Sequence, residues 1–169
     1  MTSTFIDFID LIILWIHIFT AIFFIGGSFF IWLVVYPESF KITDDEKLRT
    51  RIVGRIGKRF AVFTNASIII LILTGLYNAT WYLGPDFINA LLYTSGGQIL
   101  FVKGIVVVAM VLLMYANNMY HGKRIMKMAQ EGNMEGLKRL RKTSHLLSYI
   151  TLLLMVIITI LAVALQFFH

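Results

Sequence analysis

The chain has 169 residues, of which 59% are hydrophobic and 14% charged, and its mean hydropathy is +0.82. This composition is too apolar for an ordinary water-soluble domain of that length. The chain has no cysteine, which excludes disulfides, thiolate metal sites and covalently attached c-type haem. The net charge of +6 does not indicate nucleic-acid binding, because the basic residues flank apolar segments, where membrane topology and anionic lipid headgroups explain them.

Four apolar stretches are each long enough to cross a hydrocarbon core, which takes about 20 helical residues. They predict a single all-α domain over residues 1–169, a polytopic four-helix bundle in the cell membrane. The first stretch is not expected to be a cleavable signal peptide, because it is too long and follows acidic rather than basic residues. The predicted membrane helices cover about residues 11–36, 60–83, 99–120 and 146–168.

In chain order, the first helix is expected to end at Pro37, because proline cannot continue the hydrogen-bond pattern of a helix. The polar segment 38–58 has apolar residues at helical spacing and is expected to be partly helical. Segment 84–97 is expected to contain a short surface helix, and the third long helix to begin near Gln98. A Glu-Gly-Asn sequence at 131–133 is typical of a turn.

Small and polar residues recur at helical spacing on one face of the second membrane helix. Such a face favours close helix packing and hydrogen bonds between helices. It consists of Thr64, Ser67, Thr74, Gly75 and Asn78.

Fourteen of the fifteen lysines and arginines lie in two segments, one between the first and second helices and one between the third and fourth. The positive-inside rule places both segments in the cytoplasm. Segment 84–97 has no lysine or arginine and is expected outside, together with both termini. The basic residues are Lys41, Lys47, Arg49, Arg51, Arg55, Lys58 and Arg59, then Lys123, Arg124, Lys127, Lys138, Arg139, Arg141 and Lys142.

The fifteenth basic residue, Lys103, lies inside the third apolar stretch. A lysine at the centre of a membrane helix costs roughly 2.5–3.5 kcal/mol on insertion scales, so it indicates a functional site. His17 is a second costly residue, inside the first helix. At a rise of 1.5 Å per residue, both residues lie roughly 8–9 Å below the outer edge. Two such groups at one depth predict a shared site.

This predicted site has two open interpretations. Small side chains beside His17, including Thr20, would leave room for a flat ligand, so that His17 and Lys103 ligate a b-type haem, bind a metal or contact a quinone headgroup. Alternatively, His17 hydrogen-bonds a neighbouring helix and Lys103 extends its amine to the outer headgroups. Asn65 and Asn78 are further polar candidates for the surroundings of the ligand.

Two further pairs of residues are candidate ligands. His121 and His145 lie at the cytoplasmic ends of the third and fourth helices, where they either bind a second haem or a metal or serve as interfacial polar residues. Met110 and Met114 share a face of the third helix, and thioethers are soft ligands suited to Cu(I). Methionine is also common filler in apolar helices. His169, the C-terminal residue, is expected to be unstructured.

Several short runs of sequence resemble known membrane families. The runs are Trp15-Ile-His17, Ile25-Gly26-Gly27, Tyr36-Pro37, Arg59-Phe60-Ala61, Leu73-Thr74-Gly75-Leu76-Tyr77, Gly97-Gln-Ile-Leu with Lys103, and Gly122-Lys123-Arg124. Through these runs most of the chain, about residues 11–168, is similar to the CopD-like copper-resistance membrane domain and to the related HemJ family of protoporphyrinogen IX oxidases. The HemJ resemblance implies a b-type haem held by His17 and Lys103.

Three functions follow as hypotheses. The first is a haem-dependent redox protein that oxidises protoporphyrinogen IX or passes electrons to a quinone or respiratory acceptor, using porphyrin or quinone small molecules. The second is copper transport or copper resistance through histidine and methionine ligands. The third is an accessory subunit of a respiratory complex. A homodimer is a further expectation, since four helices give limited surface for enclosing a macrocycle.

Overall fold

The computed structural model describes the backbone of residues 2–168, and their side chains except at 2–6, 123, 126, 129, 130 and 134. The described chain is helical almost throughout and contains no strand, which confirms the all-α prediction. Four helical stretches are long and apolar enough to cross a membrane: Asp7–Ile42, Glu46–Leu83, Ser95–Gly122 and Glu135–Phe167. The elements are α1 (Thr2–Phe30), η1 (Ile31–Val35), α2 (Tyr36–Ile42), α3 (Glu46–Leu83), α4 (Phe87–Tyr93), α5 (Ser95–Asn117), η2 (Asn118–Gly122), α6 (Lys123–Glu131), α7 (Met134–Ala164) and η3 (Leu165–Phe167).

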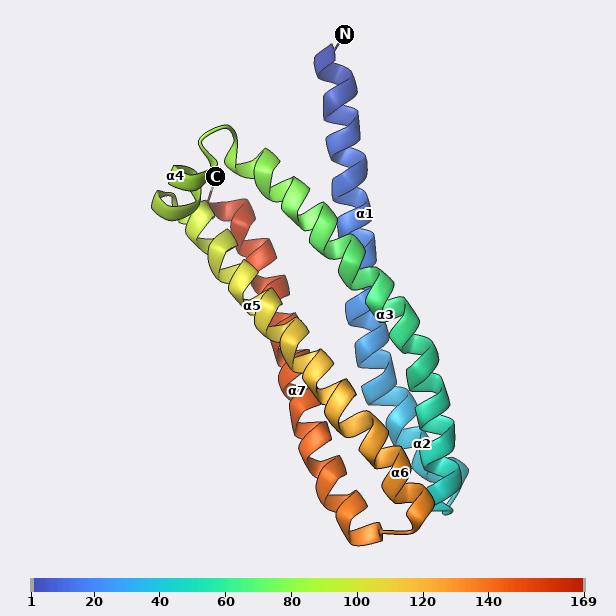
Figure 1. Ribbon diagram of the computed structural model, residues 1–169. Helices are drawn as coiled ribbons and strands as arrows, with labels where there is room; N and C mark the ends of the chain where they lie inside the picture. The colour runs from blue at the N-terminus through green and yellow to red at the C-terminus, as the bar shows by residue number, and fades with distance from the viewer. Residues whose placement is uncertain (1, 169) are drawn as a thin grey trace.

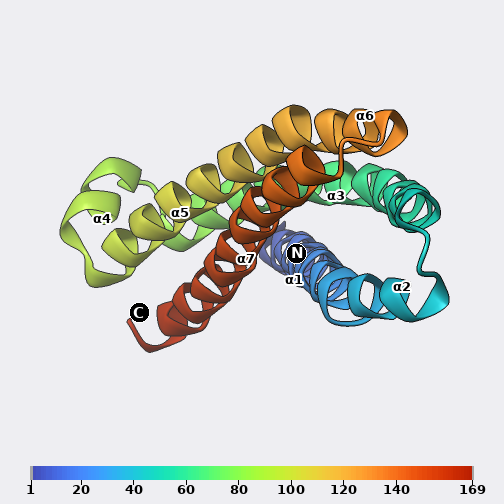
Figure 2. The same ribbon diagram turned by 90° about the horizontal axis from the view of Figure 1, so that it is seen from below.

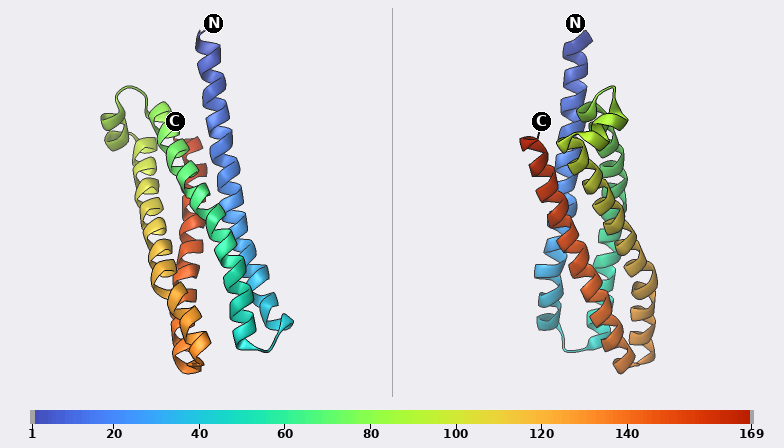
Figure 3. Two further views of the ribbon diagram at one scale, coloured as in Figure 1. Left: turned by 45° about the vertical axis from the view of Figure 1, so that its right-hand side comes forward. Right: turned by 90° about the vertical axis from the view of Figure 1, so that its left-hand side faces the viewer.

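The long helices form two antiparallel pairs, α1 with α3 and α5 with α7 (Figure 1). Helix α3 runs obliquely, so that it lies beside α2 and then α1 as far as Tyr77, while its last turns approach α4 and α5 (Figures 1 and 3). At that end, the Tyr82 hydroxyl donates to the carbonyl oxygens of Leu165 and Phe168, at 3.3 and 3.2 Å. Both termini and α4 lie at one end of the bundle, and α2 and α6 lie at the other (Figure 1). This arrangement agrees with a topology that has both basic segments on one side.

The core is small and is shared by all four long helices. Phe24 of α1, Ile68 of α3, Met110 of α5, and Leu152 and Met155 of α7 are buried and pack as one cluster. Seen from below, α7 crosses the bundle between α5 and α1 (Figure 2). Most other large apolar side chains are exposed, as membrane helices require where they face lipid.

Side-chain caps determine where three helices begin. The Asp45 carboxylate accepts hydrogen bonds from the backbone N–H groups of Lys47 and Leu48, so α3 begins at Glu46 and continues without a break into the membrane. Thr94 accepts from the N–H of Gly97, which starts α5 three residues earlier than the predicted Gln98. Asn133 caps α7 in the same way. Polar segment 38–58 is therefore more helical than expected.

The expectation that the first helix ends at Pro37 is wrong. The chain forms a π-helical turn over Ile31–Val35, in which the Tyr36 N–H donates to the Ile31 carbonyl, and then continues as α2 to Ile42. Pro37 falls in the first turn of α2, where a missing N–H is tolerated. The predicted surface helix is confirmed as α4, and Gly132 forms the predicted turn with φ of 74°. His169 lies outside the described residues.

Candidate functional site

His17 is anchored to the neighbouring helix by a side-chain hydrogen bond. Its Nδ1 lies 2.7 Å from the Thr74 hydroxyl oxygen on α3. That hydroxyl donates its own proton to the Ile70 carbonyl at 2.6 Å, so towards the imidazole it acts as the acceptor. A neutral His17 that carries its proton on Nδ1 satisfies both contacts, and in this tautomer Nε2 keeps its lone pair. Metal-binding histidines typically donate the N–H of the ring nitrogen that does not bind the metal to such an acceptor, which fixes the tautomer.

The small residue after Thr74 lets the imidazole approach α3. A Cβ atom added at Gly75 would lie 3.2 Å from His17 Cε1, which is tighter than an ordinary van der Waals contact. The predicted face of small and polar residues thus has a specific role at this level. It makes room for the imidazole and supplies its hydrogen-bond partner.

Lys103 lies on α5 and is half-buried. Asn78, one helical turn from Thr74 on α3, has a buried side-chain Nδ2 with no hydrogen-bond partner among the described residues. A buried donor without a partner is unusual and marks a place where a ligand acceptor fits. The structure therefore joins α1 and α3 at His17, with an unpartnered buried donor one turn away on α3.

Thr20 and Asn65, the other two residues predicted to surround the ligand, lie at different distances from His17. Thr20 lies one turn from His17 on α1 and is half-buried. Asn65 is nine residues from Thr74 along α3, or about 13 Å, and does not join the His17 cluster. Its side-chain oxygen accepts a hydrogen bond of 2.7 Å from the Tyr115 hydroxyl, which links α3 to α5. Asn65 is thus a residue of the helix interface.

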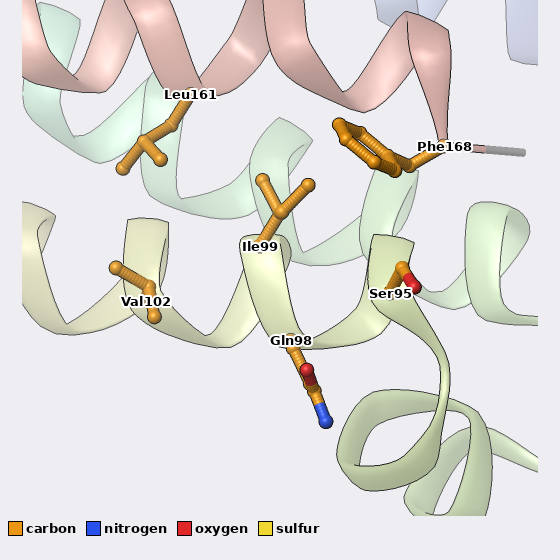
Figure 4. Close-up of a pocket in the computed structure, with 6 residues that line it drawn as sticks. All are labelled: Ser95, Gln98, Ile99, Val102, Leu161 and Phe168. Atoms are coloured by element: carbon orange, nitrogen blue, oxygen red, sulfur yellow. The ribbon is translucent and has the colours of Figure 1, made fainter.

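A shallow hollow of about 340 Å³ opens between α5 and α7 at the end that carries the termini (Figure 4). It is mainly apolar and has no titratable side chain in its lining. The candidate ligands His17 and Lys103 are not part of this hollow. Its lining residues are Ser95, Gln98, Ile99, Val102, Leu161 and Phe168.

At the opposite end, His145 is packed among aromatic rings. Its ring centroid lies 5.0 Å from that of Trp32 and 4.5 Å from that of Tyr36, both in edge-to-face geometry. His121 instead lies beside Tyr120, and its buried Nδ1 has no partner among the described residues. The prediction that the two histidines share a ligand therefore gains no support from their contacts. No group of three His, Cys, Asp or Glu side chains converges within the described part of the chain.

An ion-pair network that the sequence reasoning missed ties α7 to α3 close to His145. Arg141 contacts both Glu46 and Thr50, and Arg49 pairs with the same Glu46 carboxylate. These charged side chains are only 12–20% exposed. Arg141 and Glu46 are 95 residues apart in the chain, so no local sequence signal could have revealed this network.

The structure defines a multi-pass membrane protein, a four-helix bundle in which His17 and Thr74 are hydrogen-bonded between two apolar helices. The CopD family, described as copper resistance protein D, matches residues 54–165, and the chain belongs to this family. The match covers α3 from Gly54 onward to α7, and it does not include His17. It gives no support for the specific resemblance to HemJ.

An uncharacterized protein of Aquifex aeolicus (strain VF5) is 35% identical over 72 residues, which is 42% of this chain and 48% of that protein. The aligned part thus spans about half the length of this relative. No solved structure is significantly similar to the chain.

Proposed function

We propose that this protein handles copper within the membrane, binding Cu(I) between its helices and passing it across the bilayer. Membership of the CopD family supports copper as the cargo. The observation that carries the proposal is the hydrogen bond between His17 and Thr74, which engages Nδ1 and leaves Nε2 available for a metal. Neutral imidazole is a good ligand for copper.

The residues around His17 fit a metal ligand but do not complete a site by themselves. His17 offers one nitrogen, and no cluster of three His, Cys, Asp or Glu side chains exists in the described residues. Cu(I) is a soft ion that also accepts thioether ligands. Under this proposal, His17 is a ligand near the outer end of the path, and softer ligands lie deeper in the bundle.

This proposal is tested by copper tolerance of a copper-sensitive bacterial host that produces the protein. Production of the wild-type chain is expected to change growth at a given copper concentration, and His17→Ala is expected to remove that change. His145→Ala is the matched control, because that imidazole packs against aromatic rings at the other end of the bundle. Equal copper tolerance of cells with the wild-type chain and with His17→Ala would contradict the proposal.

A second candidate is a b-type haem, and the position of Lys103 favours it. The Nε2 atom of His17 and the amine of Lys103, from different helices, would hold the iron, and the unpartnered Nδ2 of Asn78 would offer a donor for a propionate. A bound haem would supply one-electron redox chemistry, with protoporphyrinogen IX or a quinol as the expected reductant. In that case His17 and Lys103 would hold the group and Thr74 would orient the imidazole.

An absorption spectrum of the detergent-purified protein, oxidised and dithionite-reduced, separates these two candidates. The copper proposal predicts no Soret band, even after haem is supplied during expression. A b-type spectrum that disappears in His17→Ala would establish the haem instead.

A further inference from the structure

The register between α5 and α7 is fixed by a polar contact. Asn117 on α5 donates from Nδ2 to the Ser144 carbonyl at 3.2 Å and to the Ser148 hydroxyl oxygen at 3.1 Å. The two helices are antiparallel neighbours, so equal steps from this contact toward the termini reach the same level on both (Figure 1). This contact is therefore a reference point for locating deeper residues.

Two methionines lie opposite each other at the same distance from that point. Met110 is seven residues before Asn117, and Met155 is seven residues after Ser148. Seven residues are almost two full helical turns, so both methionines keep the facing orientation of the Asn117 contact. Both are almost fully buried, with 5% and 3% of their surface exposed, and they belong to the same packed cluster.

Further residues on the same side of α5 follow Met110 toward the end of the bundle that carries the two basic segments. Met114, one turn after Met110, packs against the same cluster. Asn117 and His121 follow at helical spacing on the same side, and each carries a buried side-chain atom without a partner among the described residues. These atoms are Oδ1 of the amide and Nδ1 of the imidazole. Unpartnered buried polar atoms are rare, and here two of them follow directly after a thioether pair.

From this arrangement we propose that Met110 and Met155, with Met114 beside them, form a Cu(I) site at the α5–α7 interface. Asn117 Oδ1 and His121 Nδ1 continue the path toward the basic end. The inference rests on the proposed copper function, and it supplies the soft ligands that the His17 cluster lacks. Cu(I) enters and leaves without a change of oxidation state, so no redox partner is required. All five residues lie within the part of the chain that matches the CopD family.

The competing explanation is that these methionines only fill the core, as methionine often does. Leucine has a similar volume and is usually tolerated in place of methionine in a packed core. A Met→Leu change therefore keeps the packing and removes the sulfur, which separates the two explanations.

The test is a Cu(I) titration of the full-length protein in detergent, with ascorbate present and a chromophoric Cu(I) chelator as competitor. The double variant Met110→Leu/Met155→Leu is expected to bind Cu(I) at least about 100-fold more weakly, since even loss of an outer-shell partner weakens metal sites by 10–100-fold. Met119→Leu is the matched control, because that side chain is 73% exposed, and its affinity is expected to equal that of the wild type.

A second measurement does not depend on the folding of a variant. X-ray absorption at the copper edge of selenomethionine-substituted wild-type protein is expected to show selenium in the first coordination shell. Its absence would overturn the inference.

The outcomes also separate this inference from the proposed function. If the double variant binds Cu(I) as tightly as the wild type while His17→Ala does not, the methionine site is wrong and the copper function stands. If wild-type protein binds no Cu(I), both fail.

Discussion

The hydrogen bond between His17 and Thr74 gives the most direct prediction. Thr74→Val keeps the shape of the side chain and removes its hydroxyl, so the Nδ1–H of His17 loses its acceptor. The preference for the Nδ1–H tautomer should then weaken, and part of the population should carry its proton on Nε2. That shift would occupy the lone pair on which metal binding depends.

The magnitude follows from the energy of one hydrogen bond. A typical intramolecular hydrogen bond contributes about 0.5–1.5 kcal/mol net, which corresponds to a change of roughly 2- to 13-fold in the tautomer ratio. Hydrogen bonds between membrane helices average about 0.6 kcal/mol, near the lower end of this range. The overall stability of the bundle should therefore change little.

The assay is nitrogen-15 NMR of selectively histidine-labelled protein, because the shifts of Nδ1 and Nε2 report which nitrogen carries the proton. Wild-type His17 is expected to be mainly the Nδ1–H tautomer, and Thr74→Val is expected to move it toward Nε2–H. Thr80→Val is the matched control, since the Thr80 hydroxyl donates only to the Tyr77 carbonyl of its own helix, at 2.7 Å. A wild-type spectrum dominated by the Nε2–H form would refute the reasoning.

Further variants test the packing around the site and the ion-pair network. Gly75→Ala should displace the imidazole of His17, because the new methyl group would lie 3.2 Å from its Cε1, and the histidine NMR signals should shift. Gly57→Ala is the control, because open space surrounds the added Cβ atom, and it should leave these signals unchanged. Arg141→Leu should lower the free energy of unfolding by about 3 kcal/mol, because it leaves the mostly buried Glu46 with one partner fewer. Arg139→Leu, which breaks an exposed pair, should cost no more than about 1 kcal/mol in the same denaturation measurement. An Arg141→Leu variant as stable as Arg139→Leu would show that the network does not hold α7 to α3.

The sequence was sufficient to predict the four long helices. A membrane-spanning helix satisfies its backbone within the segment, so hydropathy alone locates it. The common depth of His17 and Lys103 was predicted from the rise per residue, and it stays a prediction.

The partners of those residues could not be derived in the same way. That Thr74 accepts the His17 proton depends on how α1 rotates and slides against α3, and helical spacing does not fix this rotation. Asn65 has the same residue type as Asn78 and lies on the same helix, yet it bonds Tyr115 and is separate from the His17 cluster. The π-helical turn before Pro37 also left no clear sequence signal.

Met155 was missed for a different reason. The fourth apolar stretch has few polar side chains, and a thioether counts as apolar, so hydropathy gives Met155 no role beyond packing. A signal was nevertheless present, because Met110 and Met155 are each seven residues from a polar residue on facing helices. It becomes informative only when the Asn117–Ser148 hydrogen bond gives the register.

Cu(I) uptake into proteoliposomes that contain the purified full-length protein tests the central claim most directly. The account predicts that Cu(I) accumulates faster than in protein-free liposomes, and that both His17→Ala and Met110→Leu/Met155→Leu remove the increase while Met119→Leu keeps it. Uptake equal to that of protein-free liposomes, by a wild-type protein that is shown to be folded and inserted, would contradict it.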